Sequence, residues 1–139
     1  EEGARFLADV VRHDPDGEIR EKAVFSLSQS DVRSAVDTIV EVARNDHDEE
    51  VRGQALFWLA QTNAERAPKV LLDALDHDPS EHVRKKAIFA ISQLDDGAPL
   101  LIRIVRERRN TELRREALFW LGQSKDPRAF DFIASVLEQ

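Results

Sequence analysis

The chain has 139 residues, of which 42% are hydrophobic and 34% are charged, and its formal net charge is −7 at pH 7. The negative charge argues against a nucleic-acid-binding protein, which needs a basic face to neutralise phosphates. The absence of cysteine excludes disulfides, thiolate zinc sites and cysteine nucleophiles, and it is compatible with both the cytoplasm and the periplasm. No apolar run reaches the length of about eighteen residues that a transmembrane helix needs.

The first predicted element is a lone amphipathic helix. Between Ala4 and Val11, apolar residues recur at the spacing of one helix face. The sequence opens on Glu1 rather than methionine and carries no visible signal peptide. We therefore expect it to be a piece of a longer chain or a processed form.

Four similar segments follow this helix. They begin 32, 32 and 30 residues apart and read IREKAVFSLSQ (19–29), VRGQALFWLAQ (51–61), VRKKAIFAISQ (83–93) and LRREALFWLGQ (113–123). Each has the apolar spacing of an amphipathic helix. Self-similarity at a period of about thirty residues is typical of a repeat protein.

Each segment precedes a second helical pattern that starts at a small residue, namely Ala35, Ala67, Gly97 and Ala129. The connection before Gly97 is two residues shorter than the others. Residues that favour helix N-caps stand before the first helices: Asp16, Asp48, Ser80 and Asn110. Pro127 is suited to a first helical turn. No segment alternates with a period of two, so we expect no strand.

The predicted fold class is an all-α solenoid of about four and a half helical hairpins, with nine helices. One hairpin cannot bury its apolar face alone, so neighbouring hairpins must stack. We expect a single domain over 1–139, with a lone second helix at 1–14 and repeats at 15–46, 47–78, 79–108 and 109–139.

The units resemble HEAT repeats, and most closely the short bacterial type called PBS-lyase HEAT-like repeats. The resemblance is carried by Val51-Arg52, by Val83-Arg84 and by KDPRAF at 125–130, and the repeat pattern extends over nearly the whole chain. It implies a right-handed α-α superhelix and a protein-binding scaffold, since members of the family share a shape rather than a chemistry. It also implies that one Arg in each first helix ties neighbouring inter-repeat loops, through Asp14, Asp46 and Asp78. These are Arg20, Arg52, Arg84 and Arg114.

The first helices carry an aromatic pattern besides their core positions. Their core is predicted at residues such as Val51, Ala55, Leu56 and Leu59. Beside the core, large and small residues alternate from repeat to repeat, as Ser26, Trp58, Ala90 and Trp120, which favours packing over ligand binding. Nearly opposite the core lie Phe25, Phe57, Phe89 and Phe119. These form either a half-buried structural ladder or a convex hydrophobic ridge that contacts a partner.

The second helices line the concave groove of HEAT-like stacks. Their outward positions here are Asp37, Glu41, Arg44, Lys69, Asp73, Asp76, Arg103, Arg106, Asp131 and Glu138. Such a mixture of charges is either solvated surface or a surface that sets the register of a bound peptide or protein.

No catalytic, metal or cofactor site is expected. The four histidines, His13, His47, His77 and His82, lie at predicted loops or helix ends, and equivalent ones are separated by layers of about 10 Å each. The Arg-rich run at 103–115 is better explained by the helix dipole than by phosphate binding. No phosphate loop or nucleophile–base pair is recognisable.

The sequence therefore predicts a non-enzymatic protein–protein interaction scaffold that uses the groove, the convex Phe ridge, or both. The alternative is an accessory domain of an enzyme such as a phycobilin-lyase-like protein. The expected partner is a protein or peptide, with no nucleic acid and no membrane insertion. Because Phe130, Phe132 and Val136 leave the last layer apolar, further chain or end-to-end self-association is also expected.

Overall fold

The computed structural model describes residues 2–138, and within this range the chain forms nine helices and no strand. The helices are α1 (Glu2–His13), α2 (Gly17–Ser28), α3 (Arg33–Asn45), α4 (Glu49–Gln61), α5 (Ala67–His77), α6 (Glu81–Ser92), α7 (Gly97–Glu107), α8 (Thr111–Gln123) and α9 (Pro127–Leu137). The predicted all-α architecture is confirmed. Each predicted repeat contains two helices, and α1 is the lone second helix.

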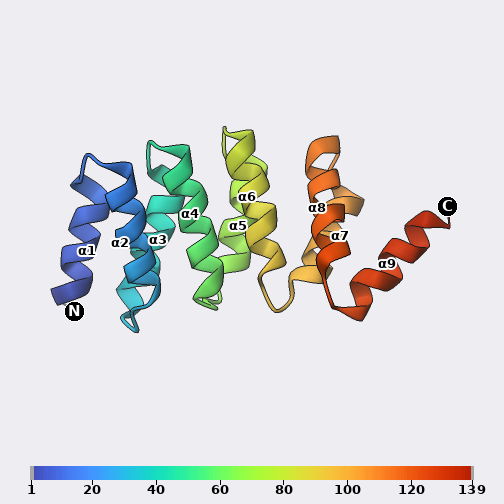
Figure 1. Cartoon of the computed structure of the whole chain (residues 1–139), viewed down its shortest axis with the longest axis horizontal. Helices are drawn as coiled ribbons and strands as arrows, with labels where there is room; N and C mark the ends of the chain where they lie inside the picture. Colours follow the sequence, from blue (N-terminus) through green and yellow to red (C-terminus); the bar gives the residue numbers. More distant parts are fainter. Residues whose placement is uncertain (1, 139) are drawn as a thin grey trace.

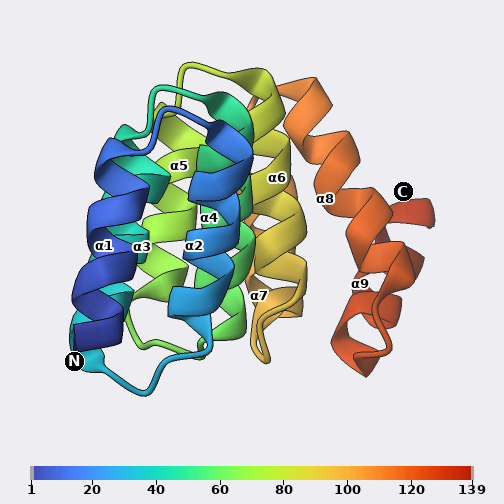
Figure 2. The same ribbon diagram turned by 60° about the vertical axis from the view of Figure 1, so that its left-hand side comes forward.

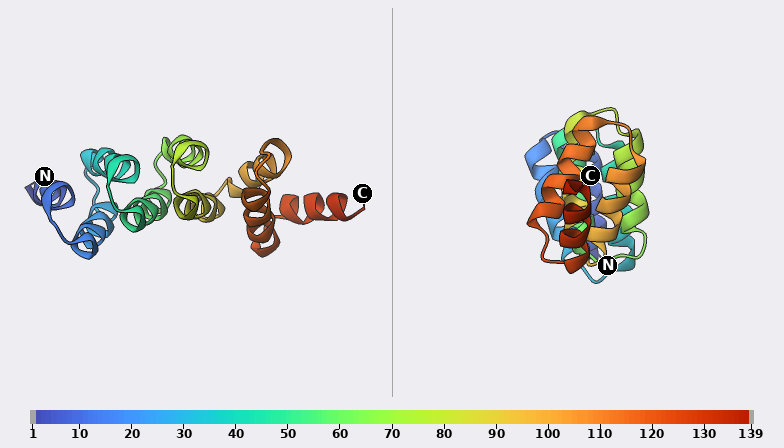
Figure 3. Two further views of the ribbon diagram at one scale, coloured as in Figure 1. Left: turned by 90° about the horizontal axis from the view of Figure 1, so that it is seen from above. Right: turned by 90° about the vertical axis from the view of Figure 1, so that its right-hand side faces the viewer.

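The helices stand side by side in two staggered layers, with the termini at opposite ends of the row (Figures 1 and 3). One layer contains α2, α4, α6 and α8, each in contact with the next. Its outer side is called the first-helix face below. The other layer contains α1, α3, α5, α7 and α9, and its outer side is called the second-helix face. Figure 2 shows α1, α3 and α5 on one side and α2, α4 and α6 on the other.

The first helix of each repeat begins where the sequence predicts, because a polar side chain satisfies one of its first free N–H groups, whereas α3, α5 and α7 have no side-chain cap. The Asp16 and Asp48 carboxylates accept from the backbone N–H groups of Glu18 and Glu50. The Ser80 and Asn110 side chains accept from the third residue of their helices. Asp126 caps α9, which has proline in its first turn. Local sequence therefore sets the boundaries of the repeats.

The core runs continuously between the two layers. Val51, Ala55, Leu56 and Leu59 are buried, as the helical spacing predicts. The alanine that recurs in every first helix is buried each time, so neighbouring helices pack closely around a small side chain: Ala23, Ala55, Ala87 and Ala117. Stacking rather than the individual hairpin thus supplies the hydrophobic stabilisation.

The stack changes at the third repeat, where the connection between α6 and α7 is short. A Cβ atom on Gly97 would lie 2.4 Å from the carbonyl oxygen of Ile91. Only glycine permits this close approach of the start of α7 to the end of α6. At the C-terminal end of the row, α9 is inclined to the other helices (Figure 1).

Candidate interaction surfaces

The loops between repeats are tied by arginines of the first helices. Arg20 donates from Nε and Nη2 to the Asp46 carboxylate at 3.0 and 3.1 Å, and from Nη1 to the Asp14 carbonyl oxygen at 2.9 Å. Arg52 does the same, with bonds of 3.0 and 3.2 Å to the Asp78 carboxylate and 2.8 Å to the Asp46 carbonyl oxygen. The side chains of Arg20 and Asp46 are only 3% and 4% exposed. The hydrogen bonds from Arg20 to the Asp46 carboxylate raise the pKa of Arg20, although burial opposes this rise.

The bond to a carboxylate is absent from the third repeat onward, so the prediction for Arg84 and Arg114 is wrong in part. Arg84 still donates to the Asp78 carbonyl oxygen at 2.8 Å. The C-cap residue that supplies the carboxylate after α3 and α5 is Arg108 after α7, and Arg108 instead bonds Asp76 at 2.8 and 3.1 Å. Arg114 donates to the backbone carbonyl oxygen of Val105 at 3.1 Å.

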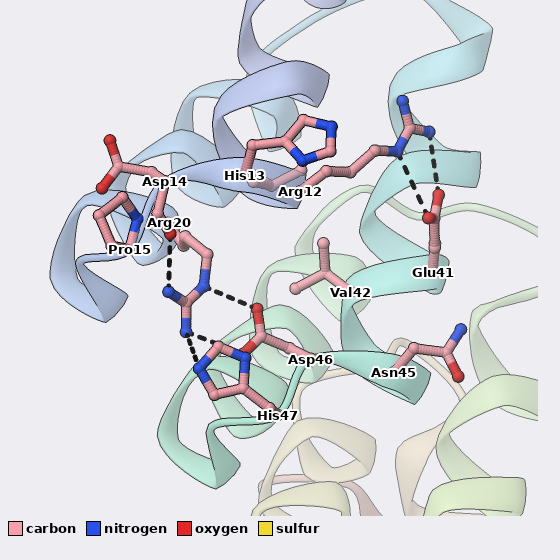
Figure 4. Close-up of a pocket in the computed structure, with 11 residues that line it drawn as sticks. Arg12, His13, Asp14, Pro15, Arg20, Glu41, Val42, Asn45, Asp46 and His47 are labelled. Carbon is pink, nitrogen blue, oxygen red and sulfur yellow. Dashed lines mark hydrogen bonds and ion pairs between the residues drawn. The ribbon is translucent and has the colours of Figure 1, made fainter.

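A hollow of about 520 Å³ lies beside the loops that lead into α2 and α4 (Figure 4). Its charged walls are paired: Arg12 donates to Glu41 at 2.9 Å, and Arg20 binds Asp46. The hydrogen bond from Arg12 lowers the pKa of Glu41. The side chains of His13 and His47 are 72% and 82% exposed. The hollow thus brings ion pairs together, and none of its described residues is a nucleophile held beside a base.

Within residues 2–138, no group of three or more His, Cys, Asp or Glu side chains is placed to hold a metal ion. Over the same range, no helix combines the length and the apolar character needed to cross a bilayer.

Several charged residues of the second-helix face form ion pairs between neighbouring repeats. Glu41 pairs with Arg12 of α1, and Arg44 lies 3.6 Å from the Asp73 carboxylate of α5. Asp37 pairs with Arg66 at the start of α5. These side chains are about half exposed, so each pair contributes at most about 1 kcal/mol. These pairs therefore neutralise part of the predicted groove within the chain.

The remaining groove residues differ in how they are used. Arg103 lies 3.7 Å from Glu107 of its own helix, and the Arg106 guanidinium lies 5.0 Å from the centre of the Phe132 ring on α9. Asp76 is bound by Arg108, as described above. Within the described part of the chain, four predicted groove residues have no ion-pair partner: Lys69, Arg106, Asp131 and Glu138.

The four predicted ridge phenylalanines form one continuous row of rings with the two tryptophans. Phe57 stacks on Phe89 with ring centres 5.7 Å apart and planes 4° apart. Trp58 reaches back to Phe25 at 4.7 Å, and Trp120 reaches back to Phe89 at 4.6 Å. The rings therefore link α2 through α8 across the first-helix face.

The structural ladder and the exposed ridge, which were the two alternatives for these phenylalanines, each describe a part of the row. Phe57 and Phe89, in the middle, are half-buried by the stacking. Phe25 and Phe119, at the ends, are 43% and 56% exposed. The middle is thus a structural ladder, whereas the ends present aromatic surface to solvent.

The ends of the solenoid also carry exposed apolar side chains. Phe6 on α1 is 68% exposed, and Phe130 and Leu137 on α9 are 74% and 80% exposed. Phe132 differs from the expectation of a bare last layer, because it is 8% exposed and packs under Arg106.

Two family models match parts of this sequence. A family model for HEAT repeats matches residues 4–92. The chain belongs to the HEAT-repeat family. A second model, for the PBS lyase HEAT-like repeat, matches residues 113–139, so the HEAT resemblance seen in VR pairs and in KDPRAF is confirmed. No curated protein matches this HEAT-repeat chain.

Sequence reasoning missed the ion pairs between neighbouring HEAT units. Arg12 and Glu41 are 29 residues apart, as are Asp37 and Arg66, which is nearly one repeat period. Opposite charges at this separation were the available signal. The aligned repeats also show that Arg108 stands where the two earlier repeats have Asp46 and Asp78.

Proposed function

We propose that this HEAT-repeat chain is a non-enzymatic scaffold that binds a protein partner through its first-helix face. The observation that supports it is the contrast between the two faces. The second-helix face has already used several of its charges in internal ion pairs. The first-helix face carries a row of aromatic rings with open ends at Phe25 and Phe119. Aromatic residues are enriched at protein interfaces, and exposed apolar patches with a polar rim mark interaction sites.

The test compares one pair of substitutions on each face. Phe25→Ser with Phe119→Ser removes the exposed rings and leaves the half-buried stack of Phe57 and Phe89 in place. Lys69→Glu with Arg103→Glu changes the second-helix face without touching its ion pairs between helices. We expect capture of a partner from native lysate, measured by quantitative mass spectrometry, to be lost in the first pair only. Loss in the second pair alone would place binding in the groove.

The second candidate is an accessory domain of a phycobilin-lyase-like enzyme, which the PBS lyase HEAT-like match over residues 113–139 favours. Identifying the captured partner separates the two candidates. A bilin-attaching enzyme among the proteins lost with the ridge variant would support the accessory role.

A further inference from the structure

Two shallow hollows lie at equivalent positions of the first-helix face. The first, of about 370 Å³, is the α2/α4 slot and is lined by Glu18, Glu21, Lys22, Phe25, Gln54 and Trp58. The second, of about 330 Å³, is the α6/α8 slot and is lined by His82, Lys85, Lys86, Phe89, Glu116 and Trp120. Both are at the small end of the range of ligand sites, which suits one inserted side chain.

The slots occur at alternate junctions because tryptophan alternates with small residues along the first helices. At the α2/α4 junction, the Trp58 indole reaches Phe25 and forms a wall of the slot. At the α4/α6 junction, Phe57 and Phe89 stack face to face instead. There the Lys86 stem also fills the space beside Gly53, since a Cβ on Gly53 would lie 3.2 Å from Lys86 Cγ.

The carboxylates of the α2/α4 slot are not neutralised by the chain. Within residues 2–138, neither Glu18 nor Glu21 forms an ion pair, and the only cation of the lining is Lys22. Partial burial raises the pKa of Glu21, and the nearby carboxylates of Glu50, Asp48 and Glu18 raise it further, against the effect of Lys86. The slot therefore combines an aromatic wall with an excess of negative charge.

The α6/α8 slot has equivalent lining positions and a similar volume but the opposite charge balance. Its Lys85 ammonium lies 3.5 Å from Glu81 and 3.6 Å from Glu112. Desolvation is the largest single effect on the pKa of Lys85 and lowers it, but these carboxylates together outweigh it, so the pKa is raised. His82 lies 2.9 Å from Glu50. Since these groups already have partners, this slot is a natural comparison for the other one.

We propose that the α2/α4 slot binds a lysine or arginine side chain from a basic segment of the protein partner, with its cationic group over the Trp58 indole and beside Glu18 and Glu21. The proposal rests on the scaffold function and specifies the chemistry of the partner. The face of an indole attracts a cation, and the two carboxylates supply the complementary charge. The net charge of −7 favours the approach of a basic segment as well.

The two tryptophans provide a direct readout, because each slot contains one of them. In a nitrogen-15 correlation spectrum, the two indole N–H signals report on the two slots separately, and the variant Trp120→Phe assigns them. The probe is an acetylated and amidated peptide of alternating lysine and serine, and a peptide of alternating glutamate and serine is its control. We expect the lysine peptide to move the Trp58 signal saturably and to leave the Trp120 signal in place.

A pair of charge-removing variants tests the role of the carboxylates. Glu18→Gln with Glu21→Gln is expected to weaken binding of the lysine peptide on the order of tenfold, since an exposed charge pair is worth up to about a factor of five. The matched control, Glu65→Gln with Asp95→Asn, removes the same charge at two exposed positions elsewhere and is expected to retain the affinity within about twofold. Circular dichroism establishes that both variants keep their helices.

Several results would overturn the assignment. Equal weakening in both pairs of variants would show that net charge alone attracts the peptide. A Trp58 signal that does not move, or that moves equally with ethylammonium chloride, would exclude a site for a partner's side chain. If the Phe25→Ser, Phe119→Ser variant lost its partner while Trp58 ignored the lysine peptide, the scaffold function would stand and the slot assignment would fail. If the lysine peptide moved the Trp58 signal but the Phe25→Ser, Phe119→Ser variant kept its partner, the slot would bind cations and the proposed scaffold function of this face would fail.

Discussion

Replacement of Arg20 by methionine tests whether the arginine ties stabilise the junctions between repeats. Methionine keeps an apolar stem of similar length but removes the bonds to the Asp46 carboxylate and to the Asp14 carbonyl oxygen. Among the described residues, the side chain of Asp46, which is 4% exposed, then keeps one hydrogen bond, from the Asp48 backbone N–H at 2.9 Å, and the exposed His47 Nδ1 lies 4.0 Å away. The substitution therefore leaves the buried Asp46 carboxylate without the guanidinium that balances its charge.

The expected cost follows from this burial. Removing one partner of a buried ion pair costs about 3–5 kcal/mol. Arg84→Met is the matched control, because Arg84 bonds a backbone carbonyl and no carboxylate among the described residues. Its loss is expected to cost about 1–2 kcal/mol. For a chain of this size, these losses of free energy of unfolding correspond to a Tm lower by roughly 10–20 °C for Arg20→Met and by roughly 3–8 °C for Arg84→Met.

Urea and thermal unfolding followed by circular dichroism measure both changes. The double variant Arg20→Met with Asp46→Asn supplies a second criterion, since relief of the unpaired charge makes it more stable than the sum of the single changes predicts. An Arg20→Met variant that loses no more stability than Arg84→Met, or a strictly additive double variant, would refute the reasoning.

The remaining predictions concern two glycines and one carboxylate. Gly97→Ala is expected to destabilise by about 2 kcal/mol or more, because its Cβ would lie 2.4 Å from the Ile91 carbonyl oxygen; an unchanged urea midpoint would contradict this. Gly53→Ala is expected to stabilise α4 by about 0.5 kcal/mol, provided that the flexible Lys86 stem moves away from a Cβ contact of 3.2 Å; a lower midpoint would show that it does not. Glu21→Gln is expected to raise the free energy of unfolding at pH 7 by up to about 0.5 kcal/mol. The raised pKa of Glu21 means that its ionised form is less favourable in the folded chain, so this gain must disappear as the pH falls below the ordinary value of 4.5, and a gain independent of pH would be contrary to it.

The sequence by itself determined the helices, their caps and their order in a row. Caps such as Asp16 and Ser80 act on backbone groups within a few residues, so their effect is readable from local sequence. The buried alanine of each first helix, such as Ala55, follows from helical periodicity. The same sequence segment recurs four times, and a single hairpin cannot bury its apolar face, so the repeats must stack on one another.

Only the tertiary structure decided which surface side chains meet across the repeats. Phe57 and Phe119 occupy equivalent sequence positions, yet the first stacks on the next layer while the second is 56% exposed. Likewise, Glu41 is an outward-facing groove residue by its helical position, but Arg12 of the neighbouring layer neutralises it. Such contacts depend on the rotation and offset between successive hairpins. Those quantities arise from packing of whole layers, and the period of the sequence does not contain them.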